Sequence, residues 1–316
     1  MTEPVKVDVH MHLYETSESG EWWKSGYEIF EYGEKKGVRF SHYSGTVEDA
    51  VEAMEKAGFS HGVAVNLLSV DLFRMEAIAM LAEEVQGEDR EKAIREIDET
   101  MADRFRSFNR WLVDSLAPIP QLTPFVGVDP TALTPEENVE HLKEMAHRGA
   151  RGIKLHPVVQ KFEPTDPRMR PVFEICRELG LTVLSHTGSA KSGERFAQPS
   201  AFAGVLPAFP GLTVLLAHLG GGQWRQTVDL AKAFPSVVFD VCEIVEWTGA
   251  PNAPTPEQLV RMIQEIGHER VMLGTDFPWY DLDHTVELVM ELPVLTTEQK
   301  EAILGENAVR ILGLPV

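Results

Sequence analysis

Residues that bind metals or move protons lie at the ends of several apolar, strand-like runs. His10 and His12 close VKVDVHMH, Lys154 and His156 lie in GIKLHP, His186 ends LTVLSH, His218 ends LTVLLAH, and Asp276 ends VMLGTDFP. Imidazole and carboxylate donors together suit zinc, manganese or iron better than calcium, which prefers an all-oxygen shell. The pattern predicts a metal centre built from residues far apart in the sequence.

His10 and His12 are two positions apart, so they share one face of an extended strand. If this strand belongs to a barrel, as the whole chain predicts below, the alternation directs one face to the barrel axis (Lys6, Asp8, His10, His12). The other face is directed to a layer of helices (Val5, Val7, Val9, Met11). Two neighbouring imidazoles on an inward face suit one divalent cation. Asp8, deeper on that face, is expected either to orient the cluster or to pair with Lys6.

His186 and Asp276 complete a predicted four-ligand site with His10 and His12. Asp276 is also a candidate to take a proton from metal-bound water, because a metal lowers the pKa of water from about 16 toward ~7. The alternative for Asp276 is a turn residue that caps the next helix. Trp279, in the same GTDFPW segment, is a candidate substrate contact.

His218 and Lys154 have roles that depend on the number of metals. With one metal, His218 acts as general acid or base; with two, it becomes a ligand of the second. Lys154 is expected to be buried, where an unpartnered lysine is costly. It is therefore expected to pair with a carboxylate or bind substrate, in preference to being carboxylated and bridging two metals. His156 is either a substrate contact or a histidine at the rim.

Basic side chains follow two of these runs, although the chain as a whole is acidic. Arg195 lies shortly after His186, and Arg225 shortly after His218. The planar fork of arginine suits a carboxylate. These residues predict an anionic substrate, with solvated or locally paired arginines as the alternative.

The apolar runs alternate with helical patterns in eight β/α units, which predicts one (β/α)₈ barrel, a TIM barrel, over residues 1–316. The strand-like runs are VKVDVHM, GVAVNLL, TPFVGVD, ARGIKLH, LTVLSH, LTVLLAH, SVVFDVC and RVMLGTD. Capping residues and terminal glycines predict helices over 47–58, 135–149, 167–180 and 255–267. An extra C-terminal helix over 296–314 is expected to pack on the outside.

Two insertions depart from a minimal barrel. Residues 13–44 follow the first strand and carry many aromatic residues, which favours a lid or pocket wall over a flap on the barrel surface. The charged stretch 83–110 is interpreted as a solvated helical hairpin or a homo-oligomer contact.

Composition limits the partners of the chain. Its formal net charge is −20, with 29 Lys+Arg against 49 Asp+Glu, which argues against nucleic acid and anionic membranes. Cys176 and Cys242 form no CxxC pair and are expected to be core thiols. The chain opens without a signal-peptide pattern and has no apolar stretch of transmembrane length. A cytoplasmic enzyme acting on a small molecule is therefore expected.

The motifs together resemble the amidohydrolase superfamily, in the amidohydrolase-related branch that includes aminocarboxymuconate-semialdehyde decarboxylase. The resemblance rests on VDVHMH, FVGVDP, GIKLHPVVQKFEPTDPRMRPVFEICRELGLTVLSHTG, LLAHLGG, RVMLGTDFPW and EQKEAILGENAVRILGL. It implies that His10, His12, His186 and Asp276 bind the metal and that His218 activates the metal water. Lys154 in KLHP also resembles the carboxylated lysine of dihydroorotase-like members. Many decarboxylases of the branch have a glutamate where this chain has His10, which favours hydrolysis.

The sequence therefore predicts a zinc-dependent hydrolase, with manganese or iron as other metals and a second metal as an open alternative. Its substrate would be a small carboxylate, amide, lactone or ester, attacked by metal-activated water. The alternative is a non-oxidative decarboxylase or hydratase of an unsaturated or aromatic carboxylic acid. A third alternative, an inactive barrel with a binding role, is disfavoured by the intact set of candidate ligands.

Overall fold

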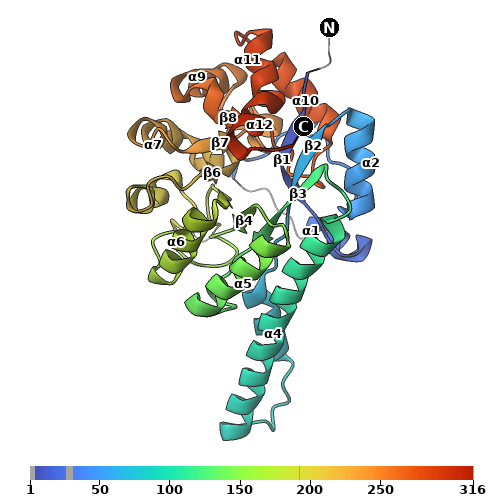
Figure 1. Ribbon diagram of the computed structural model, residues 1–316, viewed down its shortest axis with the longest axis vertical. Helices are drawn as coiled ribbons and strands as arrows, with labels where there is room; N and C mark the ends of the chain where they lie inside the picture. Colours follow the sequence, from blue (N-terminus) through green and yellow to red (C-terminus); the bar gives the residue numbers. More distant parts are fainter. Residues whose placement is uncertain (1–3, 26–30, 192, 316) are drawn as a thin grey trace.

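A computed structural model describes residues 4–25, 31–191 and 193–315, and it shows a (β/α)₈ barrel, as predicted (Figure 1). Eight parallel strands follow one another in chain order: β1 (Val7–His12), β2 (His61–Val65), β3 (Leu122–Gly127), β4 (Gly152–Leu155), β5 (Thr182–Ser185), β6 (Val214–Leu216), β7 (Val238–Asp240) and β8 (Val271–Met272). Between β8 and β1, the Val9 amide donates to the Leu273 carbonyl at 2.9 Å. A further bridge joins Met11 to Phe277.

Strand β1 contains a bulge that the alternation pattern did not predict. Its register against β2 passes from Asp8↔Gly62 to Met11↔Ala64, so β1 has one extra residue. Val7, before the shift, and Val9, within it, join an apolar cluster inside the barrel, with residues such as Val63, Val65, Phe125, Leu184, Leu215 and Met272. The prediction that Val7 and Val9 face the helices was therefore wrong, because the extra residue reverses the alternation before His10 and His12.

Twelve α-helices are defined in the described ranges: α1 (Ser17–Ser25), α2 (Val47–Ala57), α3 (Val70–Ala79), α4 (Gly87–Leu116), α5 (Pro135–Arg148), α6 (Arg170–Leu179), α7 (Thr227–Ala233), α8 (Ile244–Trp247), α9 (Pro256–Ile266), α10 (Leu282–Glu291), α11 (Thr297–Glu301) and α12 (Asn307–Leu312). Thr46, Thr134 and Thr255 each form a capping box at a helix start. The predicted helix over 167–180 begins as a 3₁₀ turn, Pro167–Met169, capped by Asp166, and continues as α6.

The C-terminal helical region covers the end of the barrel at which the strands begin. A π-helical turn, Ala302–Glu306, joins α11 to α12. A side chain at Gly305 would lie 2.2 Å from the Val5 carbonyl oxygen, so only glycine permits this approach to the chain before β1. Ala308 and Leu314 both belong to the apolar cluster inside the barrel. The prediction of a helix packed only on the outside was therefore incomplete.

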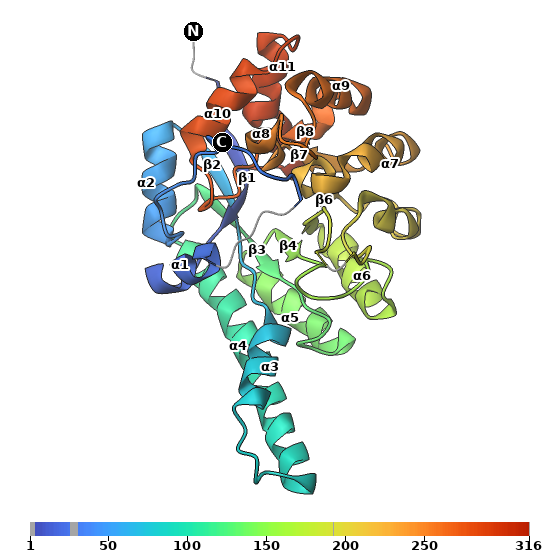
Figure 2. The same ribbon diagram turned by 180° about the vertical axis from the view of Figure 1, so that it is seen from behind.

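Helices α3 and α4 form a pair that projects from the barrel (Figures 1 and 2). Arg74 of α3 pairs with Asp98 of α4 at 2.5 Å, while Phe105 and the C-terminal part of α4 are buried against the body. The stretch 83–110 is therefore most of one long helix and not a hairpin in itself; its partner is α3.

Two expectations from composition can be compared with the described residues. Cys176 and Cys242 are both free and buried, as expected for core thiols. None of the helices in the described segments is both long and apolar enough to cross a membrane.

Candidate metal centre

A cavity of about 560 Å³ opens at the C-terminal ends of the strands. Most of the predicted site residues line it: His12, Lys154, His156, His186, His218, Asp276 and Trp279. Trp22 and Trp23 of α1 line it as well, so the aromatic insert forms part of the cavity wall. Tyr27 and Phe30 of that insert lie outside the described residues.

Three predicted ligands form a compact group, here called the donor triad: His10, His12 and Asp276. His12 Nε2 lies 3.2 Å from His10 Nε2 and 3.3 Å from Asp276 Oδ1, and His10 Nε2 lies 3.6 Å from that oxygen. Ligands about 2.0–2.2 Å from a tetrahedral ion lie roughly 3.3–3.6 Å apart. The three donors are therefore spaced as a divalent transition metal requires.

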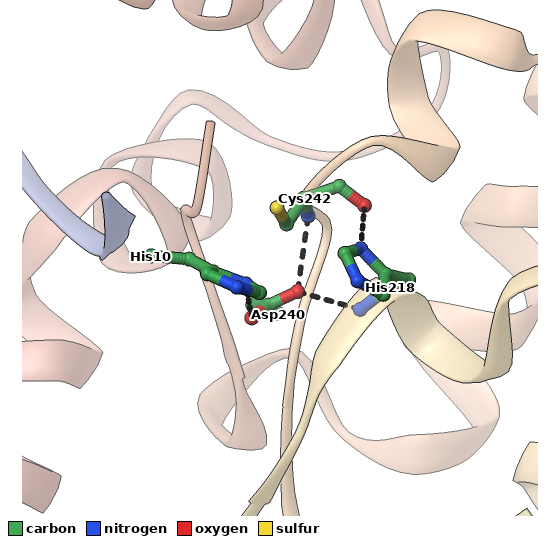
Figure 3. A group of neighbouring side chains, drawn as sticks. All are labelled: His10, His218, Asp240 and Cys242. Carbon is green, nitrogen blue, oxygen red and sulfur yellow. Dashed lines mark hydrogen bonds and ion pairs between the residues drawn. The ribbon is translucent and has the colours of Figure 1, made fainter. Parts of the chain in front are cut away.

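Asp240 at the end of β7 contacts His10, one member of the triad (Figure 3). His10 Nδ1 lies 3.3 Å from Asp240 Oδ2, and Asp240 Oδ1 accepts from the backbone amides of His218 (2.7 Å) and Cys242 (3.2 Å). A proton held on His10 Nδ1 leaves Nε2 unprotonated, so its lone pair is directed toward His12 and Asp276. Burial raises the pKa of Asp240 to about 6, which still leaves it ionised at neutral pH. The donor atoms of Asp240, His10, His218 and Cys242 also lie close enough to hold a metal ion, but both oxygens of Asp240 are engaged, so we assign it to orienting His10.

Asp8 provides a second support for the triad. Its carboxylate accepts from the His10 amide at 2.9 Å and the Thr275 amide at 3.1 Å, and it also contacts the Thr275 hydroxyl. Burial raises the pKa of Asp8 to about 7. The alternative pairing with Lys6 is not formed, since Lys6 Nζ donates to the Ala57 carbonyl at 2.6 Å.

His218 is oriented by carbonyl and carboxylate oxygens at the end of β7. Its Nδ1 lies 3.2 Å from the Cys242 carbonyl (Figure 3). The same nitrogen lies 3.5 Å from Glu243 Oε2. A carbonyl only accepts, so Nδ1 carries the proton and Nε2 is left unprotonated. Burial lowers the pKa of His218, which keeps the ring neutral at pH 7. This tautomer suits a general base.

Three residues that border the cavity have positive φ angles, which residues other than glycine rarely adopt. The φ angles of His218, Glu243 and Asp276 are 62°, 60° and 59°. For residues other than glycine, such conformations cost about 1–3 kcal/mol each and concentrate at functional sites. The surrounding packing therefore supports an unfavourable backbone in order to place these side chains.

Lys154 lies at the floor of the cavity, only 1% exposed, with Nζ against His10 Nε2. Within the described residues, no carboxylate lies at ion-pair distance from Lys154. The expected carboxylate pairing is therefore not formed, and substrate binding and carboxylation remain as alternatives. Burial lowers the pKa of Lys154 to about 8.

His186, the fourth predicted ligand, lies across the cavity from the triad. Its ring stacks on His156 with centroids 4.0 Å apart, and it meets the His218 ring edge-on at 4.9 Å. Its donor atoms are not part of the close group formed by the triad. Ligation by His186 stays a prediction.

Arg195 and Arg225 lie away from the cavity. Arg195 is exposed and its Nε donates to Gln198 Oε1 at 3.2 Å, while Arg225 is exposed over the Trp224 ring at 4.2 Å. Neither side chain lines the cavity. The two arginines predicted to bind substrate are therefore not brought to the candidate centre.

Sequence reasoning missed Asp240, Glu243 and Glu31. Asp240 lies inside the predicted run SVVFDVC, and β7 ends at it, so a search for polar residues within the apolar runs could have found it. Glu243 and Glu31 lie in irregular segments and carry no comparable signal. Glu31 belongs to the aromatic insert, yet its Oε1 lies 4.0 Å from His186 Nε2.

Comparison with known proteins agrees with this fold. The model of the amidohydrolase family matches residues 7–314. The chain belongs to the amidohydrolase family. It is 27% identical over 240 residues to 2-amino-3-carboxymuconate-6-semialdehyde decarboxylase of Dictyostelium discoideum. That match spans 65% of this chain and 66% of the relative, just short of two thirds.

Two solved structures share the fold of this amidohydrolase at low identity. One is a dihydroxybenzoic acid decarboxylase from Polaromonas sp. JS666, with bound manganese and the inhibitor 2-nitroresorcinol; its TM-score is 0.69 at 15% identity, over 98% of this chain and 97% of that one. The other is a candidate 2-pyrone-4,6-dicarboxylic acid hydrolase from Pseudomonas putida, with a TM-score of 0.63 at 20% identity over the whole of both chains. The buried histidine and aspartate cluster points to a divalent metal site in this chain as well.

Proposed function

We propose that this amidohydrolase is a metal-dependent, non-oxidative decarboxylase of a small unsaturated or aromatic carboxylic acid. The observation that carries the proposal is the position of the donor triad at the floor of a cavity whose walls include Trp22, Trp23 and Trp279. Indole rings suit a flat, conjugated substrate. The curated relative reported above is a decarboxylase of a conjugated acid, which supports the same reaction class.

The apolar walls also favour the chemistry. Decarboxylation converts a charged carboxylate into neutral carbon dioxide, so the localised charge is lost as the reaction proceeds. Leu67, Val158 and Val159 line the cavity together with the tryptophans. An environment that solvates the carboxylate poorly and carbon dioxide well lowers the barrier between them.

The residues have separable tasks in this reaction. His10, His12 and Asp276 would hold the ion, with His186 as the predicted fourth ligand. When bound, a divalent ion supplies positive charge that attracts the oxygens of the substrate and stabilises the electron density left on carbon. The carbon–carboxyl bond breaks, its electron pair stays on the substrate carbon, and that carbon takes one proton. His218, whose Nε2 is free to collect a proton from solvent, would deliver it, and Asp276 is the other candidate.

Hydrolysis is the second candidate, and two observations favour it. This chain has a histidine, His10, at the first position of the pair, and the unprotonated Nε2 of His218 could accept a proton from water. On this basis, a lactone or ester would be opened and no carbon dioxide would be released.

The test is a direct product assay on protein loaded with Zn²⁺ or, separately, Mn²⁺. The substrates are those named for the three relatives: 2-amino-3-carboxymuconate-6-semialdehyde, dihydroxybenzoic acid and 2-pyrone-4,6-dicarboxylic acid. We expect carbon dioxide release from one of the first two, abolished by a chelator. Opening of the pyrone without carbon dioxide release, and no reaction with the two acids, would overturn decarboxylation in favour of hydrolysis.

A further inference from the structure

The carboxylate of Glu31 occupies a cradle of backbone amides on the wall of the cavity. Its Oε2 accepts from the Ser189 amide at 3.0 Å and from the Gly222 amide at 2.6 Å. The side chain is only 11% exposed, although Glu31 belongs to the insert after β1 and the amides follow β5 and β6. Three segments far apart in the sequence therefore meet around one anion.

The cradle has room for a carboxylate because three of its residues are glycines, which have no side chain. A Cβ at Gly188 would lie 2.6 Å from Glu31 Oε1, and a Cβ at Gly221 or Gly222 would lie 2.8 or 2.9 Å from Oε2. We call Gly188, Ser189, Gly221 and Gly222 the amide cradle. Backbone N–H groups that converge in such a concavity bind anions without a charged side chain. The space that the glycines leave open has the size of one carboxylate.

The amide cradle belongs to the same cavity as the donor triad. Glu31, Ser189 and His186 all line that cavity. Among the described residues, the Glu31 carboxyl accepts from the two amides, and its Oε1 lies 4.0 Å from His186 Nε2. A carboxylate of a ligand could therefore take its place by making the same two hydrogen bonds.

We propose that the amide cradle is a carboxylate subsite of the active site, and that Glu31 is an internal occupant which the ligand's carboxylate displaces. The choice of a carboxylate ligand rests on the proposed function, but the exchange itself concerns binding and not turnover. Trp22 and Trp23 lie on the same insert and line the same cavity.

The first experiment measures binding of benzoate to metal-loaded protein by calorimetry, with benzamide as the neutral probe of the same shape. Glu31→Ala should tighten benzoate binding about 10-fold, because the apparent affinity no longer includes the cost of expelling the internal occupant. Benzamide binding should change little. Glu34→Ala is the matched control: it removes the same charge from an exposed position of the same insert and should leave both affinities near wild type.

The second experiment locates the effect. Gly188 lacks the left-handed backbone of many glycines in this chain, so alanine fits its conformation, yet its methyl group would fill the cradle. Adding Gly188→Ala to Glu31→Ala should remove the gain for benzoate, with circular dichroism and metal content confirming an intact fold. Hydrogen exchange at the Ser189 and Gly222 amides should accelerate in Glu31→Ala and slow again when benzoate is added.

Unchanged or weaker benzoate binding in Glu31→Ala would overturn the proposal, and so would a gain that survives Gly188→Ala. The readout does not depend on the reaction. If no acid is decarboxylated but benzoate still responds as expected, the proposed function fails and the carboxylate subsite stands.

Discussion

The two sides of the cavity hold their functional groups by different means. On the triad side, His10 and His12 project from one strand, and the buried carboxylates of Asp8 and Asp240 contact the backbone and the ring of His10. On the cradle side, the groups are backbone amides of loops, and the carboxylate that meets them comes from an insert. One side is a rigid set of donors, whereas the other is a socket with an exchangeable occupant.

This difference assigns the reaction to the triad side of the cavity and ligand recognition to the cradle side. Donors that rest on strands and buried supports are held to the precision that a metal needs. Loops can be rebuilt without disturbing the barrel, so they are suited to adapt to different ligands. Substitutions on the triad side should therefore reduce metal binding and turnover, and those on the cradle side should change ligand affinity.

The largest effect is expected from removing the imidazoles of the triad. His10→Ala combined with His12→Ala should lose the metal and lower activity by at least about 10³-fold, since several kcal/mol of charge stabilisation disappear. Metal content by mass spectrometry and activity are the measurements, and circular dichroism checks the fold. His42→Ala, at an exposed histidine, is the control. Full activity in metal-stripped protein would show that the reaction does not need a metal at the triad.

His218 lies between the two sides, and its substitution sharpens the division. His218→Asn should lower kcat by roughly 10²–10⁴ while the metal stays bound, as expected for a lost general acid or base. Loss of one equivalent of metal would instead place His218 among the ligands of a second metal. Kinetics and metal stoichiometry on the same preparation distinguish these outcomes.

Asp240 tests whether the rigidity of the triad side matters. Asp240→Asn keeps the side-chain shape, but its amide group would face His10 Nδ1 and favour the tautomer with a proton on Nε2. Metal affinity should fall about 10–100-fold, the usual scale for lost support behind a ligand. Competition with a chelator measures this affinity. An unchanged affinity would mean that the carboxylate behind His10 is dispensable.

The smallest effect is expected from the rim arginines. Arg195→Ala and Arg225→Ala should each change KM by less than about 2-fold, because both side chains are exposed and outside the cavity. Steady-state kinetics with the true substrate measures this, and Gly188→Ala, which fills the amide cradle, is the contrasting variant. A large rise in KM in either arginine variant would show that recognition does not reside in the cradle.

The barrel and the triad could be predicted because both follow from local patterns. Each apolar run has the length of a strand, and parallel strands of a barrel bring their C-terminal ends to one mouth. His12 and Asp276 therefore had to be neighbours once their runs were recognised as strands.

Other features depend on the path of the chain, which periodicity does not encode. The bulge in β1 adds one residue without changing the sequence pattern, so Val7 and Val9 were placed on the wrong face. The return of Glu31 from the insert to the loops after β5 and β6 is a long-range contact of irregular segments. The positions of Arg195 and Arg225 depend on loop conformation in the same way.

The bulge in β1 also has an evolutionary consequence. It divides a single strand into a lower part that contributes Val7 and Val9 to the interior cluster and an upper part that presents His10 and His12 to the mouth. Each part can accept its own substitutions, because repacking the interior leaves the donors at the same height on the strand. Gains in thermal stability and changes of substrate can thus accumulate in one short segment without competing for the same positions.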